Sequence, residues 1–315
     1  MKKIILFFCT LSVGLLYSQK NTSDDFTCSP YYGNFNSAKL KYHQGSTDFV
    51  LLDSLIQKAL STNSKPLSVD LFFSLKVYAK NCREDHFVAV SEMLLKNGLN
   101  INTILNEVPS CISKNGIKEK LKNIIPYNKD NAIAKLLNEI HDDDKKSQSV
   151  LTSNKKREEI NNKNYTKLIG IINQVKKWPG ISVSGQDLNI YHVDISYDFT
   201  QALLHFNQNQ IETLMPYLKE AIKNQELSPY HFARIYDYYY IKKTTDESLK
   251  EALKKNPKDL LGNSKQQLPG IISKQFYGIY KSNDRKEIYP AVIDPDKLKE
   301  RREKICMIGD DLELD

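Results

Sequence analysis

His205 and Asp237 form the best pair for proton transfer in this sequence. Imidazole titrates near neutral pH, and a neighbouring carboxylate can orient the ring, as in many general acid–base sites. Both residues fall in segments that we predict to be helical, so spacing alone leaves their contact open. No serine or cysteine lies in a nucleophile-elbow context that would complete a triad. The pair predicts either a shared polar site or a structural, hydrogen-bonded histidine.

Two clusters of acidic residues with a histidine are candidates for cation binding. They are His141 with Asp142, Asp143 and Asp144, and His192 with Asp194 and Asp198. Neither cluster has zinc-site spacing, and neither has the glycine turn and acidic twelfth ligand of a calcium loop. We therefore interpret both as solvated acidic residues and predict no metal and no cofactor.

Tyrosines and arginines offer groups for recognition. Tyr236, Tyr238, Tyr239 and Tyr240 occupy four of five consecutive positions in a predicted helix. They cannot all face one core, so we expect at least one to be exposed as an anchor for a partner, unless the helix is buried on two sides. Arg301 and Arg302 could clamp a carboxylate or phosphate, but adjacent helix positions point apart, so at most one joins a given site.

The N-terminus has the order of a secretory signal peptide. Lys2 and Lys3 precede a mostly apolar stretch over 4–16, and a polar run begins at Lys20. The stretch is shorter than the roughly 17 to 25 residues of a spanning helix. We predict cleavage near Ser18 or Gln19, removing residues 1–19, and export to the periplasm or the medium without a stable membrane anchor.

Four cysteines follow the predicted cleavage site: Cys28, Cys82, Cys111 and Cys306. An even count in an oxidising compartment permits one or two disulfides, and their spacing matches no zinc signature. Buried free thiols at Cys82 and Cys111 remain an equal alternative.

Composition is that of a folded chain. Its 315 residues are 40% hydrophobic and 26% charged, with a net charge of +7. These values exclude collagen-like and wholly disordered chains. Basic residues alternate with acidic ones, as in 155–159 and 297–304, rather than gathering beside aromatic residues, so we predict no nucleic-acid partner.

A polar run divides the chain. Residues 142–154 hold few large apolar side chains, and we predict a linker there between domains at 28–141 and 155–310. In the first domain, apolar residues recur at helical spacing over 49–60, with Ser46, Thr47 and Asp48 placed to cap the start. A similar stripe covers 133–140.

The first domain resembles ankyrin repeats in part. Lys80, Asn81 and Cys82 recur 34 residues later as Lys114, Asn115 and Gly116, and a helix is predicted after each. The 93–102 segment, with Gly98 as a left-handed helix cap, is similar to the end of an ankyrin repeat, whose period is about 33 residues. A generic helical domain is the alternative. The resemblance implies a surface that binds another protein.

The second domain is also predicted to be helical. A helix beginning at Tyr165 ends before Trp178 and Pro179, and others cover 198–207, 211–223, 229–241 and 245–255. Pro216 should kink the third of these or begin a new helix. The segments 275–280 and 287–292 alternate as a β-hairpin, and a short helix covers 295–304.

A series of residues over 165–309 follows one pattern in order and in most spacings. They are Trp178, Pro179, Val183, Gly185, His205, Met215, Pro216, Asp237, Gln275, Tyr277, Gly278, Pro290, Asp294, Arg301, Arg302 and Gly309. In these residues the segment resembles a family of uncharacterised bacterial domains of unknown function. Three positions depart from the family's pattern, where Asn207 replaces an aspartate, Tyr238 an arginine and Tyr280 a glutamine. The resemblance implies the fold more than an activity.

We therefore predict a mainly α protein with an N-terminal helical, ankyrin-like repeat domain and a C-terminal helical domain that contains one β-hairpin. The leading hypothesis is an exported, non-enzymatic module that binds another protein, with Trp178, Tyr238, Gln275, Tyr277 and Arg301 as candidate binding residues. The alternative is a hydrolase-like enzyme that uses His205 and Asp237 in a cleft closed by Tyr277 and Arg301.

Overall fold

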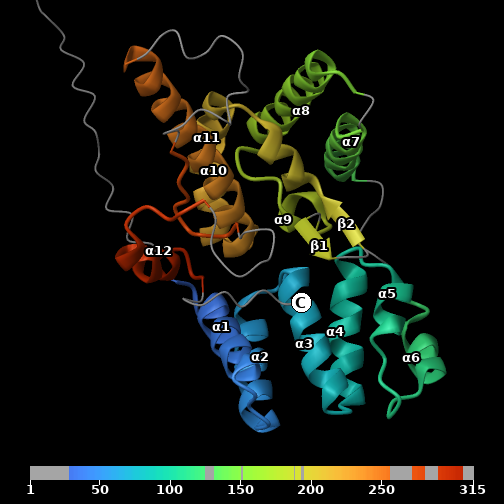
Figure 1. Ribbon diagram of the computed structural model, residues 1–315. Coiled ribbons are helices and arrows are strands. Elements are labelled where there is room, and N and C mark those ends of the chain that lie inside the picture. The colour runs from blue at the N-terminus through green and yellow to red at the C-terminus, as the bar shows by residue number, and fades with distance from the viewer. Residues whose placement is uncertain are drawn as a thin grey trace, which may run out of the picture.

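A computed structural model describes residues 28–124, 131–149, 152–187, 189–192, 195–255, 272–280 and 290–307 (Figure 1). The chain is mainly helical, as predicted. Its elements are α1 (Pro30–His43), α2 (Phe49–Thr62), α3 (Ser68–Lys80), α4 (Glu84–Lys96), α5 (Ile101–Asn106), α6 (Lys114–Leu121), α7 (Ala132–Ser147), α8 (Asn154–Val175), α9 (Ile181–Ser184), β1 (Asn189–His192), β2 (Ile195–Asp198), the 3-10 helix η1 (Phe199–His205), α10 (Gln208–Lys223), α11 (Pro229–Lys255), the 3-10 helix η2 (Pro295–Lys297) and α12 (Leu298–Lys304). The predicted signal peptide lies outside the described residues.

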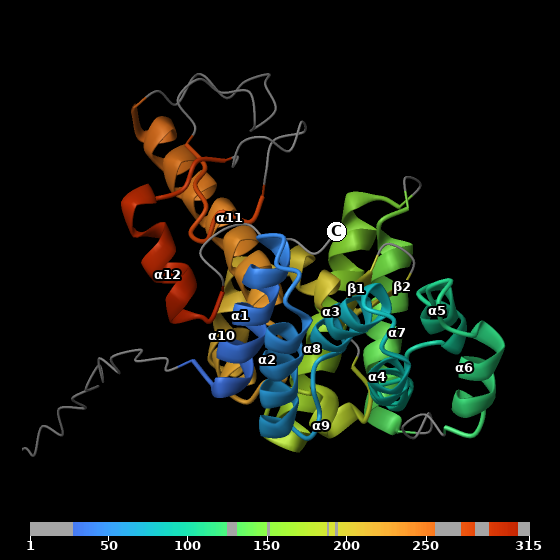
Figure 2. The ribbon, with the colours of Figure 1, turned by 90° about the horizontal axis from the view of Figure 1, so that it is seen from below.

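Helices α1 to α6 form one layer, in which α1 packs on α2 and α3 packs on α4 (Figure 1). Two helix ends in this layer are where the sequence predicted them. The Asp48 carboxylate accepts from Leu51 N at 3.0 Å and caps α2. Gly98 has φ +95°, and Leu99 N donates to Leu94 O, which completes a Schellman turn after α4. Viewed from below, α1 to α4 lie side by side, with α5 and α6 next to α4 (Figure 2).

The 34-residue recurrence does not mark structurally equivalent positions. Lys80 is the last residue of α3, whereas Lys114 is the first residue of α6. The two copies therefore sit at opposite ends of their helices, and an ankyrin-like repeat is not confirmed. If repeats are present, each unit would have to begin at α1, α3 or α5, the first helix of each pair.

One break predicted in the second half, after Ile241, is absent, and Pro216 does not begin a new helix. α11 runs without interruption from Pro229 to Lys255, so the predicted gap after Ile241 is wrong. The Thr244 and Thr245 hydroxyls donate to carbonyls of the preceding turn, which lets these polar residues continue the helix. α10 likewise contains Pro216 within one helix. The segment predicted as an α-helix over 198–207 is largely the 3-10 helix η1.

The described part of the chain contains one antiparallel hairpin, and it was not the one predicted. Strands β1 and β2 pair with Asn189 opposite Asp198. Within the predicted hairpin, Gln275 and Val292 form an isolated parallel bridge, and residues 281–289 lie outside the described residues. The predicted hairpin is therefore not confirmed.

The predicted linker is partly helical. α7 continues to Ser147, and both Asp144 and Ser147 are buried, so the polar run 142–147 is a helix with one covered face. One continuous cluster of buried apolar residues reaches from Tyr31 to Cys306 and includes side chains from both predicted domains. No helix in the described ranges is both long and apolar enough to cross a membrane.

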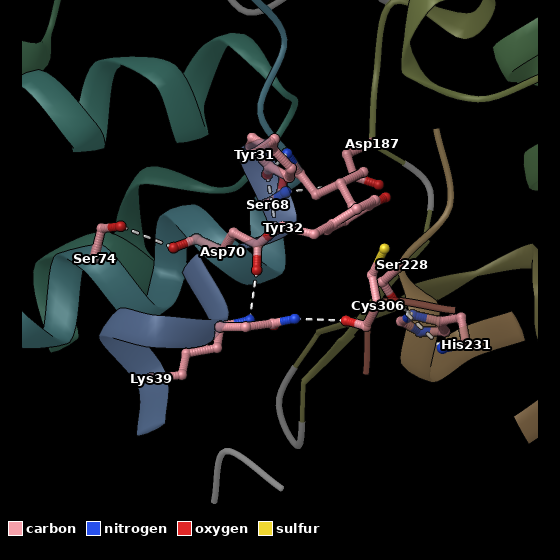
Figure 3. A network of polar contacts seen from close by, with 12 residues as sticks. Tyr31, Tyr32, Lys39, Ser68, Asp70, Ser74, Asp187, Ser228, His231 and Cys306 are labelled. Atoms are coloured by element: carbon pink, nitrogen blue, oxygen red, sulfur yellow. Dashed lines mark hydrogen bonds and ion pairs between the residues drawn. The ribbon is translucent and has the colours of Figure 1, made fainter. Parts of the chain in front are cut away.

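A buried polar network joins α1 and α3 to the second half of the chain (Figure 3). The Asp70 carboxylate accepts from Tyr31 Oη at 2.7 Å and from Lys39 Nζ. Tyr32 Oη donates to Leu227 O at 3.0 Å, and Ser68 N donates to the Asp187 carboxylate at 2.6 Å. Burial, and then the charge of Asp70, raises the pKa of Tyr31 well above its usual range, so the phenol stays a donor.

Two disulfides use all four cysteines of the described chain. Cys28 pairs with Cys306, and Cys82 pairs with Cys111, with Cα atoms 5.4 Å and 6.0 Å apart. The alternative of free thiols at Cys82 and Cys111 is thereby excluded. The first bridge ties Cys28, two residues before α1, to Cys306, two residues after α12, and Asn36 Nδ2 also donates to Cys306 O.

Candidate functional site

The structure gives His205 and Asp237 different partners. His205 Nε2 lies 3.8 Å from Asp144 Oδ1, at the end of η1. Asp237, on α11, accepts from three main-chain N–H groups in 276–279. Among the described residues, His205 and Asp237 therefore form no hydrogen bond or ion pair with each other, and Asp237 and Tyr277 are buried.

Asp237 holds a loop in place. One carboxylate oxygen accepts from Phe276 N at 2.7 Å and Tyr277 N at 2.6 Å, and the other accepts from Ile279 N at 2.8 Å. The side chain is fully buried. Burial raises the pKa of Asp237, although the three amide groups and Arg302 act in the opposite direction. The Asp237 carboxylate therefore binds the main chain of its own protein and not a ligand.

Gln275, Arg301 and Arg302 bond to the same segment of the main chain. We call these three residues and Asp237 the C-terminal clamp. Gln275 is fully buried, donates to Tyr280 O and Pro290 O, and accepts from Tyr280 N. Arg301 donates to Phe276 O and Ile293 O, and Arg302 donates to Tyr277 O and Gly278 O. Arg301 and Arg302 therefore both donate to main-chain carbonyls of the same loop. We had expected at most one of these adjacent arginines to join a given site.

Asn207, Tyr238 and Tyr280, the three residues that differ from the pattern of the resembled family, each make a contact within the chain. Asn207 caps α10, a role that aspartate fills equally well. The rings of Tyr238 and Tyr280 lie 6.1 Å apart, so two of the departures contact each other. Lys242 Nζ lies 4.4 Å above the Tyr238 ring and donates to Leu204 O at 2.9 Å.

None of Tyr236, Tyr238, Tyr239 and Tyr240 is more than partly exposed, so the exposed anchor expected among these four is wrong. Tyr239 is buried, with its hydroxyl on Glu212 of α10 at 2.7 Å. Tyr236 and Tyr240 pack on Phe276, on another side of the helix. α11 is thus covered on two sides, which was the alternative interpretation.

Trp178 and Tyr277 are buried as well. Trp178 stacks on Phe199 with ring centroids 5.6 Å apart and is 2% exposed, so it lies in the core and not at a binding surface. Tyr277 is 6% exposed. Of the five predicted binding residues, only Tyr238 and Arg301 reach partial exposure.

The acidic clusters show no metal arrangement where they are described. Asp143 lies 3.3 Å from Lys163 Nζ and 3.2 Å from Lys167 Nζ, and Asp144 faces His205. No group of three or more possible metal ligands occurs among the described residues. Asp194, in the second cluster, lies outside them.

Ser228 and His231 form a contact that sequence reasoning missed. Ser228 Oγ lies 2.5 Å from His231 Nδ1, which is the distance of a serine nucleophile and its base. The same Oγ accepts from His231 N at 3.1 Å just before α11, and both residues are buried. The contact is therefore a helix cap, and the Ser-Pro-x-His order at the helix start was its signal.

His205 instead belongs to an open pocket of about 200 Å³ between α8, η1 and α10, which we call the amide pocket. Its lining residues are mostly amides: Asn154, Arg157, Glu158, Asn161, Asn162, His205, Asn207 and Gln210. Arg157 donates to Ser147 O and Ser149 O, both at 3.1 Å, so it fixes the end of α7 against α8. Asn161 Nδ2 donates to His205 O at 3.3 Å.

Main-chain groups fix the orientation of the amides at the rim. Asn207 Oδ1 accepts from Gln210 N at 3.0 Å, and Asn207 N donates to Gln210 Oε1 at 2.9 Å, forming a capping box. Gln210 Nε2 must then be the donor to Asn162 Oδ1, at 2.9 Å. Consequently Asn162 and Asn207 each keep an NH₂ group without a hydrogen-bond partner among the described residues.

The pocket is close to neutral at pH 7. Burial, followed by the charges of Lys242 and Arg157, lowers the pKa of His205. His205 is therefore uncharged, and Arg157 and Glu158 balance each other in the lining. The site offers oriented, uncharged hydrogen-bonding groups rather than a general base paired with a nucleophile.

Comparison with protein-family models, with curated proteins and with solved structures finds no match for this chain. The two resemblances noted in the sequence therefore remain predictions.

Proposed function

We propose that this chain is an exported module that binds another protein and has no catalytic activity of its own. The main support is that the polar side chains of the C-terminal clamp bond to main-chain groups of the protein itself. Asp237 is one of the two residues that the hydrolase-like interpretation needs, and it is buried and accepts from main-chain N–H groups of its own chain. Gln275 and Arg302 beside it are also buried and bonded to main-chain groups. The hydrolase-like alternative gains no support from His205, whose ring lies beside Asp144 and whose carbonyl oxygen accepts from Asn161.

Export is supported by the cysteines. Disulfides persist in oxidising compartments and are rare in the cytosol. Both bridges, Cys28–Cys306 and Cys82–Cys111, agree with a chain that a signal peptide over residues 1–19 delivers to the periplasm or the medium.

We further propose that α1 to α6 are ankyrin-like helix pairs. The first helices of successive pairs begin at Pro30, Ser68 and Ile101, close to the repeat period of about 33 residues. Val50 and Leu51, adjacent in the first turn of α2, are 77% and 38% exposed. Adjacent exposed apolar side chains on a repeat layer are suited to contact a partner.

Crosslinked affinity capture from a native envelope extract tests the proposal. The whole exported chain is the bait, because Tyr32–Leu227 and Cys28–Cys306 contacts join its halves. We expect one or a few proteins to be retained by the wild type and fewer by Val50→Gln/Leu51→Gln. Retention of no protein above a bait-free control contradicts a protein-binding function, and equal retention by the variant contradicts the role of this α2 surface.

A further inference from the structure

We infer that the amide pocket binds the main chain of an extended peptide segment, through the free NH₂ groups of Asn162 and Asn207. This inference rests on the proposed protein-binding function and names the part of the partner that is recognised. It begins from the fixed orientation of the rim: Gln210 bridges the two asparagines, and each presents a donor to the pocket.

The two oriented NH₂ groups are hydrogen-bond donors, so a ligand must supply oxygen acceptors. Peptide carbonyls are such acceptors, and each is followed along a peptide by an N–H donor. The pocket also supplies acceptors for those donors, because the exposed Asn154 and Glu158 lie in its lining. Donors and acceptors thus occur together, which matches an amide backbone.

The spacing along α8 fits an extended segment. Asn154, Glu158 and Asn162 are separated by four residues each and lie on one face of the helix. From the first to the third is roughly 12 Å at 1.5 Å per residue. An extended chain covers that distance in about four residues at 3.3 Å each.

Other ligand classes fit the pocket less well. A phosphate or free carboxylate calls for net positive charge, yet Arg157 is committed to the carbonyls of Ser147 and Ser149, and Glu158 balances its charge. Nucleobases bind by stacking on aromatic side chains, and the described lining contains no Phe, Tyr or Trp. A neutral amide chain remains.

The test uses Asn162→Asp/Asn207→Asp in the whole chain. Aspartate keeps the oxygen that accepts from Gln210 at both positions, and it caps a helix as well as asparagine does, so the fold is preserved. Only the two NH₂ donors are lost. Asn173→Asp/Asn209→Asp is the matched control, because both asparagines are exposed on the same two helices and outside the pocket lining.

The probe is a fluorescent pool of random-sequence octapeptides with acetylated and amidated ends, measured by anisotropy. We expect the wild type and the control to bind equally, and the pocket variant at least tenfold more weakly with its melting temperature unchanged. A second pool with methylated backbone nitrogens should bind the wild type at least tenfold more weakly. Absence of wild-type binding at 1 mM peptide, equal binding by the pocket variant, or equal binding of the methylated pool overturns the inference.

The same three chains serve as baits in crosslinked capture, which separates this inference from the proposed function. If the wild type and the pocket variant retain the same protein equally, the protein-binding function stands and the amide pocket is not its site. If no chain retains a protein, the proposed function itself fails, and the peptide measurements still decide the chemistry of the pocket.

Discussion

The C-terminal clamp and the amide pocket are both rich in polar side chains, but they use them differently. In the clamp, Asp237 and Gln275 are buried, and their oxygen atoms accept from amide groups of the same loop. At the pocket rim, Asn162 and Asn207 are exposed, and each uses only its oxygen to bond with Gln210. The difference shows that a cluster of polar residues indicates binding only where it keeps unused groups that solvent reaches.

Electrostatics separate the two regions as well. The clamp contains formal charges, with Asp237 and Arg302 both buried beside main-chain partners. Removing one member of such a set leaves the others unpaired, which costs more than an exposed contact. The pocket rim is neutral and half open, so its side chains contribute little to folding. Substitutions in the two regions should therefore lower stability by different amounts.

The largest effect is expected for Asp237→Ala. It leaves three amide groups of 276–279 without their acceptor and removes the charge that faces Arg302. We expect a loss of about 4 kcal/mol in the free energy of unfolding, measured by urea denaturation. Asp237→Asn keeps one acceptor oxygen and should lose about half as much. A loss below about 1 kcal/mol for the alanine variant would contradict the structural role of the clamp.

The second effect concerns the bridge beside the clamp. Cys28→Ser/Cys306→Ser should lower the free energy of unfolding by roughly 3 kcal/mol, because the bridge restrains a loop of 278 residues in the unfolded chain. Limited proteolysis should then cleave first in 290–307, while the amide pocket keeps its peptide affinity. Cys82→Ser/Cys111→Ser is the comparison, because its loop spans 29 residues and its loss should be smaller. Equal losses would show that loop length does not set the effect here.

A third, smaller effect separates capping from binding at one residue. Asn207→Ala removes the cap of α10 and should cost about 1 kcal/mol, whereas Asn207→Asp keeps the cap and should cost nearly nothing. Thermal unfolding followed by circular dichroism measures both. If the aspartate variant were as unstable as the alanine variant, the NH₂ group of Asn207 would have a partner in the fold and would not be available to a ligand.

The smallest effect is a pH dependence at the pocket. The folded-state pKa of His205 is lowered, so the unfolded chain binds a proton more readily. This contribution to stability is therefore complete above the unfolded pKa of about 6.5 and declines as pH falls from there toward the folded-state pKa. His205→Gln should flatten the melting temperature between pH 7 and pH 5 relative to the wild type. A steeper pH dependence in the variant would mean that Asp144, and not burial, governs the ring.

Helix ends and apolar stripes could be predicted from the sequence because they depend on near neighbours. Asp48, Gly98 and Pro179 each mark a boundary through a local rule, and the helices begin or end beside them. The gap assigned after Ile241 failed for the opposite reason. Thr244 and Thr245 are polar, but their hydroxyls bond within α11 and to Lys274 and Ser273 of a distant segment.

The candidate site was predicted only in part. His205 was identified, but its neighbours were not, because asparagines carry no motif and their free groups follow from tertiary contacts. One local signal was present: Asn207 and Gln210 stand at the spacing of a capping box. The cysteine count permitted two bridges, but pairing Cys28 with Cys306 requires knowing that α1 lies beside α12.

The Cys28–Cys306 bridge makes the polypeptide a covalent ring over nearly its whole described length. A single cut in any loop of that ring leaves one molecule, because the two pieces stay joined through sulfur. On a non-reducing gel the nicked protein keeps its mass, and only a reductant releases the fragments. The ring can also close only after Cys306 has been made, so α1 gains its final attachment last during synthesis. Outside the cell, where proteases are common, a closed ring loses material only after a second cut.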